Sequence, residues 1–153
     1  MNEQSYQNKH LVEISIENKD DDITETFRWV YSTDTMTHQD IISGILFSIF
    51  INAFHGGGFS NLLSIYSRRN GVSYKQFYDQ LLDYCMKDSY IGDYFKSLDK
   101  QYKQWYKLGT GNLESIASIS FGANNDMVHL LCKIHADNKY DHIFKLLKHY
   151  MKS

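Results

Sequence analysis

The feature that most constrains this chain is a long apolar run at residues 41–54 (IISGILFSIFINAF). A membrane-spanning helix needs about 20 such residues, and this run is bounded by Asp40 and His55. Thr37 followed three positions later by Asp40 is the pattern of a helix N-terminal cap. We therefore expect a helix that belongs to the core of the protein rather than a membrane span.

Small and polar residues form one stripe along this expected helix. Gly44, Ser48 and Asn52 are spaced four apart, so they lie on the same side of a helix. The other sides are almost entirely apolar, which is typical of a helix in the middle of a domain. We expect the stripe to be a groove in which another helix packs closely.

The segment before the apolar run has the pattern of a β-hairpin. Apolar and polar residues alternate in residues 10–17 (HLVEISIE), with the period of a half-buried strand. The alternation returns in residues 23–31 (ITETFRWVY), where Phe27 and Trp29 share a face. The polar residues 18–22 between the two segments predict a turn.

Helical patterns fill the rest of the chain. They cover residues 61–70, 72–88, 90–108, 113–121, 125–136 and 139–151. Because the strands are segregated from the helices, the sequence predicts an α+β fold. We expect it to be predominantly helical, with an N-terminal β-hairpin followed by about six packed helices. One compact domain is expected over residues 1–153, with residues 1–9 loosely ordered.

Cysteine usage and charge limit the classes of protein. Cys85 and Cys132 stand alone in the sequence, which is typical of reduced thiols in the cytoplasm. The start of the chain lacks the basic and then apolar pattern of a secretion signal. Residues 1–60 hold nine acids and three bases, a net charge of −6, and the remainder holds nine acids and thirteen bases, a net charge of +4. This asymmetry indicates electrostatic docking of a partner.

The run of three glycines after the apolar helix resembles the loop that supplies oxyanion-hole amides in esterases. Such a loop needs a serine in a Gly-x-Ser-x-Gly turn, which this sequence lacks. An anion could also bind to the loop amides. The residues of that alternative are Gly56, Gly57, Gly58, Arg68 and Arg69, with His55 beside them. We expect instead that the glycines end the helix and reverse the chain.

Two further patterns contain the residue types of a metal site and of a nucleic-acid surface, but their arrangement supports neither. Asp126, His129, Cys132 and His135 follow one another along one expected helix, but steps of three drift around a helix and do not converge on one metal. We expect no metal and no cofactor. A row of lysines in residues 90–108 is interrupted by acids, and nucleic-acid binding needs a broad positive face.

The function expected from these patterns is partner binding without catalysis. The chain has twelve tyrosines, a residue type that dominates protein–protein hot spots. We expect an inhibitor or immunity-type protein, which occludes the active site of a basic enzyme such as a nuclease toxin. Low arginine usage with high lysine, isoleucine, asparagine and tyrosine usage is typical of an AT-rich bacterial or phage gene. The residues expected to approach that partner are Glu17, Asp20, Asp21, Asp22 and Glu25. The alternatives are a small ligand- or anion-binding enzyme domain and a homo-oligomeric structural protein. Membranes, nucleic acids and small molecules are not expected as partners.

Overall fold

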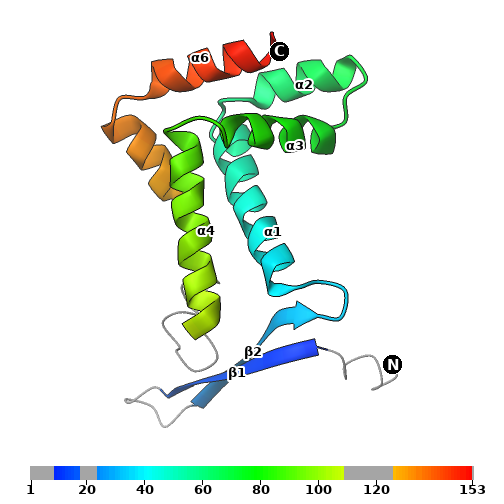
Figure 1. The fold of residues 1–153 in the computed structure, drawn as a ribbon, viewed down its shortest axis with the longest axis vertical. Coiled ribbons are helices and arrows are strands. Elements are labelled where there is room, and N and C mark those ends of the chain that lie inside the picture. The colour runs from blue at the N-terminus through cyan, green and yellow to red at the C-terminus, as the bar shows by residue number, and fades with distance from the viewer. Residues whose placement is uncertain (1–8, 18–23, 109–125, 153) are drawn as a thin grey trace.

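The computed structural model describes residues 9–17, 24–108 and 126–152. Within them a two-stranded antiparallel sheet precedes a set of helices (Figure 1). The elements are β1 (Lys9–Glu17), β2 (Thr24–Thr33), α1 (His38–Ile51), a π-helix (Asn52–Gly56), α2 (Asn61–Arg69), α3 (Tyr74–Cys85), α4 (Ile91–Leu108), a helix over residues 126–136, and α6 (Tyr140–Tyr150). The predicted α+β, predominantly helical fold is confirmed. The helix predicted at residues 113–121 lies outside the described residues, as do eight of the nine N-terminal residues predicted to be loosely ordered.

The predicted hairpin is present, and its register places apolar residues of the two strands opposite one another. Val12 is opposite Trp29, and Ile14 is opposite Phe27. Opposite positions of a ladder lie on one face of a sheet, so the apolar positions of both strands share a face. The register shifts between His10 and the next residue of β1, which is the signature of a β-bulge. The hairpin lies at the foot of α1 and α4, at the opposite end from α2, α3 and α6 (Figure 1).

The start of α1 is fixed by the capping box that the sequence predicts. The Asp40 amide donates to the Thr37 hydroxyl at 3.2 Å, and the Thr37 amide donates to the Asp40 carboxylate at 2.8 Å. The hydrogen bonds from the Thr37 side chain and backbone lower the pKa of Asp40. The cap satisfies amides that the first turn of a helix otherwise leaves without partners.

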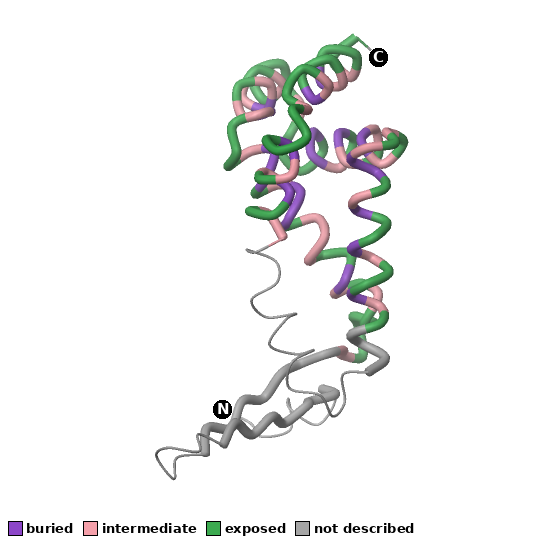
Figure 2. Tube along the Cα trace, turned by 90° about the vertical axis from the view of Figure 1, so that its left-hand side faces the viewer, coloured by how far each residue is buried: buried purple, intermediate pink, exposed green. Residues whose placement is uncertain are grey.

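The core lies where α1 meets α3 and α4. α1 and α4 run side by side, and α3 lies across the end of α1 (Figure 1). Phe50 stacks on Phe54 with ring centroids 4.4 Å apart, and it meets Phe95 of α4 edge-on at 5.8 Å. α4 contributes Phe95, Leu98 and Tyr102 to this core, and all three are buried. Figure 2 shows buried positions gathered where the helices meet, with exposed positions on their outer sides.

α1 is buried on one side only, which corrects the prediction of a helix surrounded by others. Its buried residues are Ile42, Ile49 and Phe50. Gly44, Ser48 and Asn52 are exposed, and a methyl group added at Gly44 would meet no atom within 4 Å. The predicted helix-packing groove is therefore wrong for the described residues. Small side chains permit a close approach, but here α3 and α4 occupy other sides of α1.

The three glycines turn the chain, as predicted, but they do so after a π-helix that the sequence did not indicate. Gly57 keeps an ordinary helical φ of −71°, whereas Gly58 has a φ of +85°, in the region that favours glycine. The Ser60 amide then donates to the Phe54 carbonyl at 2.8 Å and closes the corner. In the described part of the chain no single helix is long and apolar enough to cross a membrane, and the helices on either side of this corner pass that test only as a pair bent by 93°.

Candidate functional site

The acidic residues expected to bind a partner are only partly described. Residues 20–22 lie outside the described structure, so their role stays a prediction. In the hairpin, Glu17 is opposite Thr24 and Glu25 is opposite Ile16. Successive pairs of a ladder alternate between the two faces of a sheet. Glu17 and Glu25 therefore occupy register positions on different faces of the hairpin.

The amides of the glycine corner are used within the protein. The Gly57 amide donates to two carbonyls of the π-helix at 3.0 and 3.1 Å, and the Gly58 amide donates to the His55 carbonyl at 3.1 Å. Gly56 belongs to the π-helix itself. An oxyanion hole or an anion nest needs amides that are free to donate to a ligand, so this corner is built as a turn.

The two arginines grouped with the glycines lie elsewhere. Arg68 and Arg69 are in the last turn of the nine-residue helix α2, about 12 Å along the helix from its beginning at the glycine corner. The guanidinium carbon of Arg68 lies 5.0 Å from the centroid of the Tyr74 ring, at the start of α3. Tyr74 in turn meets the His55 ring edge-on at 6.3 Å. Arg68 therefore contacts the same tyrosine ring that His55 contacts.

His55 is the outer end of a hydrogen-bonded chain that leads into the core. Its Nδ1 lies 2.7 Å from the hydroxyl of Tyr78, and that hydroxyl lies 3.3 Å from Oγ of Ser60. Ser60 is fully buried, and Tyr78 is 3 % exposed. Buried polar groups are costly unless they are hydrogen-bonded, so this chain fixes the orientation of the His55 ring and pins α3 to the corner.

A hollow of about 370 Å³ opens beside this ring, between α1 and α3. It is lined by Phe47, Ile51, His55, Tyr74, Lys75 and Tyr78. Lys75 forms an ion pair with Asp79 on the same helix. The hollow therefore combines apolar walls with one oriented imidazole and one lysine that is paired with an acid.

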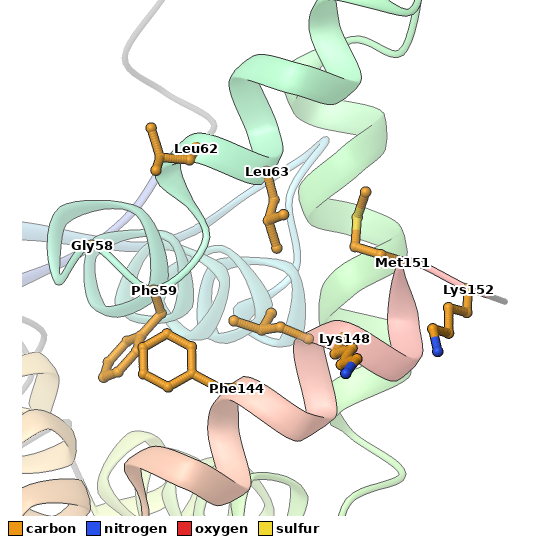
Figure 3. Close-up of a pocket in the computed structure, with 9 residues that line it drawn as sticks. Gly58, Phe59, Leu62, Leu63, Phe144, Lys148, Met151 and Lys152 are labelled. Atoms are coloured by element: carbon orange, nitrogen blue, oxygen red, sulfur yellow. The ribbon is translucent and has the colours of Figure 1, made fainter.

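A second and larger groove, of about 490 Å³, lies between α2 and α6 (Figure 3). It is lined by Gly58, Phe59, Leu62, Leu63, Phe144, Leu147, Lys148, Met151 and Lys152. Leu62 is 80 % exposed and Phe144 is 55 % exposed. The rings of Phe59 and Phe144 meet edge-on at one end, with centroids 6.1 Å apart. The α2–α6 groove is therefore an apolar surface that the described chain leaves uncovered.

The charged side chains that line the α2–α6 groove are Lys148 and Lys152. Residues 144–152 carry Lys145, Lys148 and Lys152 and no acid. Among the described residues, none of these three lysines forms an ion pair. The groove can therefore accept an apolar side chain from a partner whose neighbouring surface is neutral or negatively charged.

The residues considered for metal binding contact other side chains separately. The Asp126 carboxylate accepts a hydrogen bond from Tyr102 at 2.8 Å, and His129 lies 3.2 Å from the hydroxyl of Tyr94. No group of three or more His, Cys, Asp or Glu side chains is placed to hold a metal within residues 9–17, 24–108 and 126–152. Cys132 is exposed and Cys85 is buried. Burial, together with the charge of Asp88, raises the pKa of the Cys85 thiol to about 12, which makes it a poor nucleophile at neutral pH.

Two lysines of the α4 row are paired with acids on their own helix. Lys96 pairs with Asp93 at 3.1 Å, and Lys103 pairs with Asp99 at 2.6 Å. Exposed pairs of this kind contribute little to stability, but they reduce the positive charge that a nucleic acid would meet. The described part of α4 thus has the character of a solvated helix face.

The sequence analysis missed Tyr78 and the α2–α6 groove. Helical spacing places Phe77 inward. Tyr78, the next residue, is also buried, so the buried face of α3 is wider than the spacing indicates. The groove joins helices that are far apart in the chain, so no local spacing could indicate it. The one sequence signal of the groove is the apolar Leu62 in an otherwise largely polar helix.

Comparison with known proteins adds no family to this picture. No protein-family model matches the chain. A search of curated proteins likewise returns no match. The candidate sites are therefore interpreted from their own geometry.

Proposed function

We propose that this protein is a small non-enzymatic binding protein that docks a partner protein in the α2–α6 groove. The observation that carries the proposal is the exposure of Leu62 and Phe144, at 80 % and 55 %, on the two walls of one apolar groove. Single exposed apolar residues are ordinary on protein surfaces. Apolar residues that gather around a groove are typical of interaction surfaces.

The construction of the groove suits binding. Its walls are α2 and α6, and Leu147 at its base is 2 % exposed. Because both walls are helices, little backbone needs to be ordered when a partner arrives, which lowers the entropic cost of association. Covering a large apolar side chain such as Leu62 or Phe144 is worth about 1.5–3 kcal/mol. Anchor residues of this kind account for most of the binding energy in many interfaces.

The more specific form of the proposal is an inhibitor or immunity-type protein of the cytoplasm, which occludes the active site of an enzyme such as a nuclease toxin. The charge distribution of the sequence supports it, because residues 1–60 carry a net charge of −6. Acids at residues 20–22 would attract a basic cleft and raise the association rate. The hairpin and the α2–α6 groove lie at opposite ends of the molecule (Figure 1), so the two surfaces must be tested separately.

The test is co-purification with variants that change one surface at a time. Leu62→Ser and Phe144→Ser remove the two exposed anchors of the groove. Val128→Ser is the matched control, because Val128 is also exposed, at 50 %, but does not line the groove. We expect a partner that is retained by wild type and by Val128→Ser and lost by both groove variants.

Other outcomes would redirect the proposal. Retention of the partner by both groove variants would exclude the groove as the docking site. If the wild-type protein were a dimer that the groove variants converted to a monomer, the groove would be a contact between copies and the homo-oligomeric alternative would hold. For the acidic residues, replacing Asp20, Asp21 and Asp22 with Asn should slow association and reduce its salt dependence, with little change in dissociation.

A further inference from the structure

We infer that the hollow between α1 and α3 binds a small hydrophobic carboxylate, which accepts a hydrogen bond from Nε2 of His55. The hollow and the α2–α6 groove share no lining residue. The inference therefore goes beyond the proposed docking function and does not depend on it. It rests on the buried hydrogen bonds behind His55, on the summed charge of Lys75, Asp79 and Arg68 and on the apolar walls.

The buried hydrogen bonds determine which imidazole nitrogen carries the proton. The hydroxyl of Ser60 is fully buried, and among the described residues its one side-chain partner is the hydroxyl of Tyr78. A buried donor without an acceptor is costly, so Ser60 donates to Tyr78. The single proton of Tyr78 is then donated to Nδ1 of His55, at 2.7 Å. Neutral imidazole carries one proton, so that proton is on Nε2.

Nε2 is therefore a donor on a ring that is fixed in orientation and lines the hollow. The His55 ring lines the hollow, and in the described structure Nε2 has no hydrogen-bond partner, because the one hydrogen bond of the ring is at Nδ1. A ligand that satisfies Nε2 must offer an acceptor, such as a carboxylate oxygen. Protonation of His55 would leave Nε2 a donor and would add a positive charge, so the preference for an anion does not depend on the charge of the ring.

The charges around the hollow favour an anion over a cation. Lys75 lines it but is paired with Asp79. Arg68 lies over the Tyr74 ring, which forms part of the wall. Among the described residues Arg68 has no carboxylate partner. The charges of Lys75, Asp79 and Arg68 sum to +1 (+1 − 1 + 1), which disfavours a ligand ammonium group.

The walls select a hydrophobic body for that carboxylate. Phe47 and Ile51 come from α1, and the Tyr74 ring comes from α3. The volume of about 370 Å³ lies in the range of small-molecule sites. Such sites combine apolar walls with a few oriented polar groups. An aromatic ring joined to a carboxylate by a short link fits both features.

The test is a titration of the full chain, followed by NMR, with three probes that share one ring: phenylacetate, phenylacetamide and 2-phenylethylammonium. We expect phenylacetate to shift the resonances of His55, Ile51 and Tyr74 at millimolar concentration. The neutral amide should bind several-fold more weakly, and the ammonium compound should leave these resonances unchanged. Equal shifts from the ammonium compound, or no shift from phenylacetate, would overturn the inference.

Two pairs of variants separate ligand binding from a merely structural pin. His55→Asn keeps a polar atom near the position of Nδ1 for Tyr78 and removes Nε2, and it should weaken phenylacetate binding about tenfold or more. The control is His135→Asn, because the His135 Nδ1 also lies near a tyrosine hydroxyl, that of Tyr140 at 3.3 Å, outside the hollow. Arg68→Gln should weaken binding several-fold, whereas Arg69→Gln should not. Unchanged affinity in both His55→Asn and Arg68→Gln would leave the hydrogen-bonded chain a structural feature and refute the site.

Discussion

Nε2 of His142, on α6, lies 2.9 Å from Oδ2 of Asp88, in the segment between α3 and α4. The other oxygen of Asp88 accepts hydrogen bonds from the amides of Tyr90 and Ile91, both at 2.9 Å. The Asp88 carboxylate therefore caps the start of α4 and also joins α6 to the segment between α3 and α4. The side chain of Asp88 is only 10 % exposed, so water can replace few of these bonds if the carboxylate is lost.

This arrangement predicts a specific loss of stability in acid. Burial alone would raise the pKa of Asp88, but the hydrogen bonds from the Ile91 amide, from His142 and from the Tyr90 amide outweigh it and hold the pKa below the ordinary 3.8. A carboxyl whose pKa is lowered by folding contributes stability above its unfolded pKa and loses that contribution as the pH falls through its folded pKa. Wild-type protein should therefore lose part of its free energy of unfolding between about pH 5 and pH 2.

Asp88→Asn is the variant that checks this prediction. It should lower the free energy of unfolding at pH 7 by about 1–3 kcal/mol, and the difference from wild type should shrink in acid. Urea denaturation at pH 7 and pH 3 measures both. Asp93→Asn is the control, because Asp93 is in an exposed pair with Lys96 and should change stability by less than about 0.5 kcal/mol. A difference between Asp88→Asn and wild type that is the same at both pH values would contradict the prediction.

A second prediction concerns the aromatic core. Phe50 is fully buried, between Phe54 on its own chain segment and Phe95 on α4. Phe50→Ala should lower the free energy of unfolding by about 3–5 kcal/mol, because the cavity cannot close between two helices. Leu46→Ala should cost less, since Leu46 is only partly buried. Thermal or urea unfolding of both variants is the measurement, and equal costs would contradict the orientation of α1.

The parts of the fold that the sequence predicts are those that local periodicity determines. Alternation predicts that Phe27 and Trp29 share a face, because strand faces alternate with every residue, and the structure pairs these residues with Ile14 and Val12. Thr37 and Asp40 predict the start of α1, because a cap depends on neighbours in sequence. The exposed side of α1 at Gly44 was not predicted, since an apolar helix does not reveal how many neighbours it has.

The candidate sites depend on contacts between distant segments. His55 stands out in the sequence beside the glycines, but its functional neighbour is Tyr78, on the next helix but one. The pairing of Leu62 with Phe144 across the α2–α6 groove likewise depends on how α6 returns over α2. Periodicity reports which face of a helix is buried and not which helix covers it, so these relationships required the structure.

A third prediction concerns the two thiols. At pH 8 the thiol reagent DTNB should react quickly with the exposed Cys132 and slowly with Cys85, whose burial raises its pKa to about 12, because the thiolate is the reactive form. The native protein should release one equivalent of the coloured product rapidly and a second only after denaturation. Cys132→Ser should abolish the rapid phase. A denatured, unreduced protein with no reactive thiols would instead indicate a disulfide.

The last prediction uses two glycines with opposite surroundings. A methyl group at Gly57 would lie 2.2 Å from the Ala53 carbonyl oxygen and 2.9 Å from Cδ2 of Leu131. Leu131 can move, but that carbonyl accepts the Gly57 amide at 3.0 Å and is part of the corner. Gly57→Ala should therefore lower the free energy of unfolding by about 1–3 kcal/mol, through steric overlap rather than through an unusual φ.

Gly44→Ala is the matched comparison, since Gly44 is an exposed position inside α1 and has no atom within 4 Å of an added methyl group. Alanine restricts the unfolded chain and favours a helix, so this change should raise the free energy of unfolding by about 0.5–1 kcal/mol. Urea denaturation of the two variants beside wild type should show shifts of opposite sign. If Gly44→Ala destabilised the protein as strongly as Gly57→Ala, the stripe on α1 would be packed against another element and its exposure would be wrong.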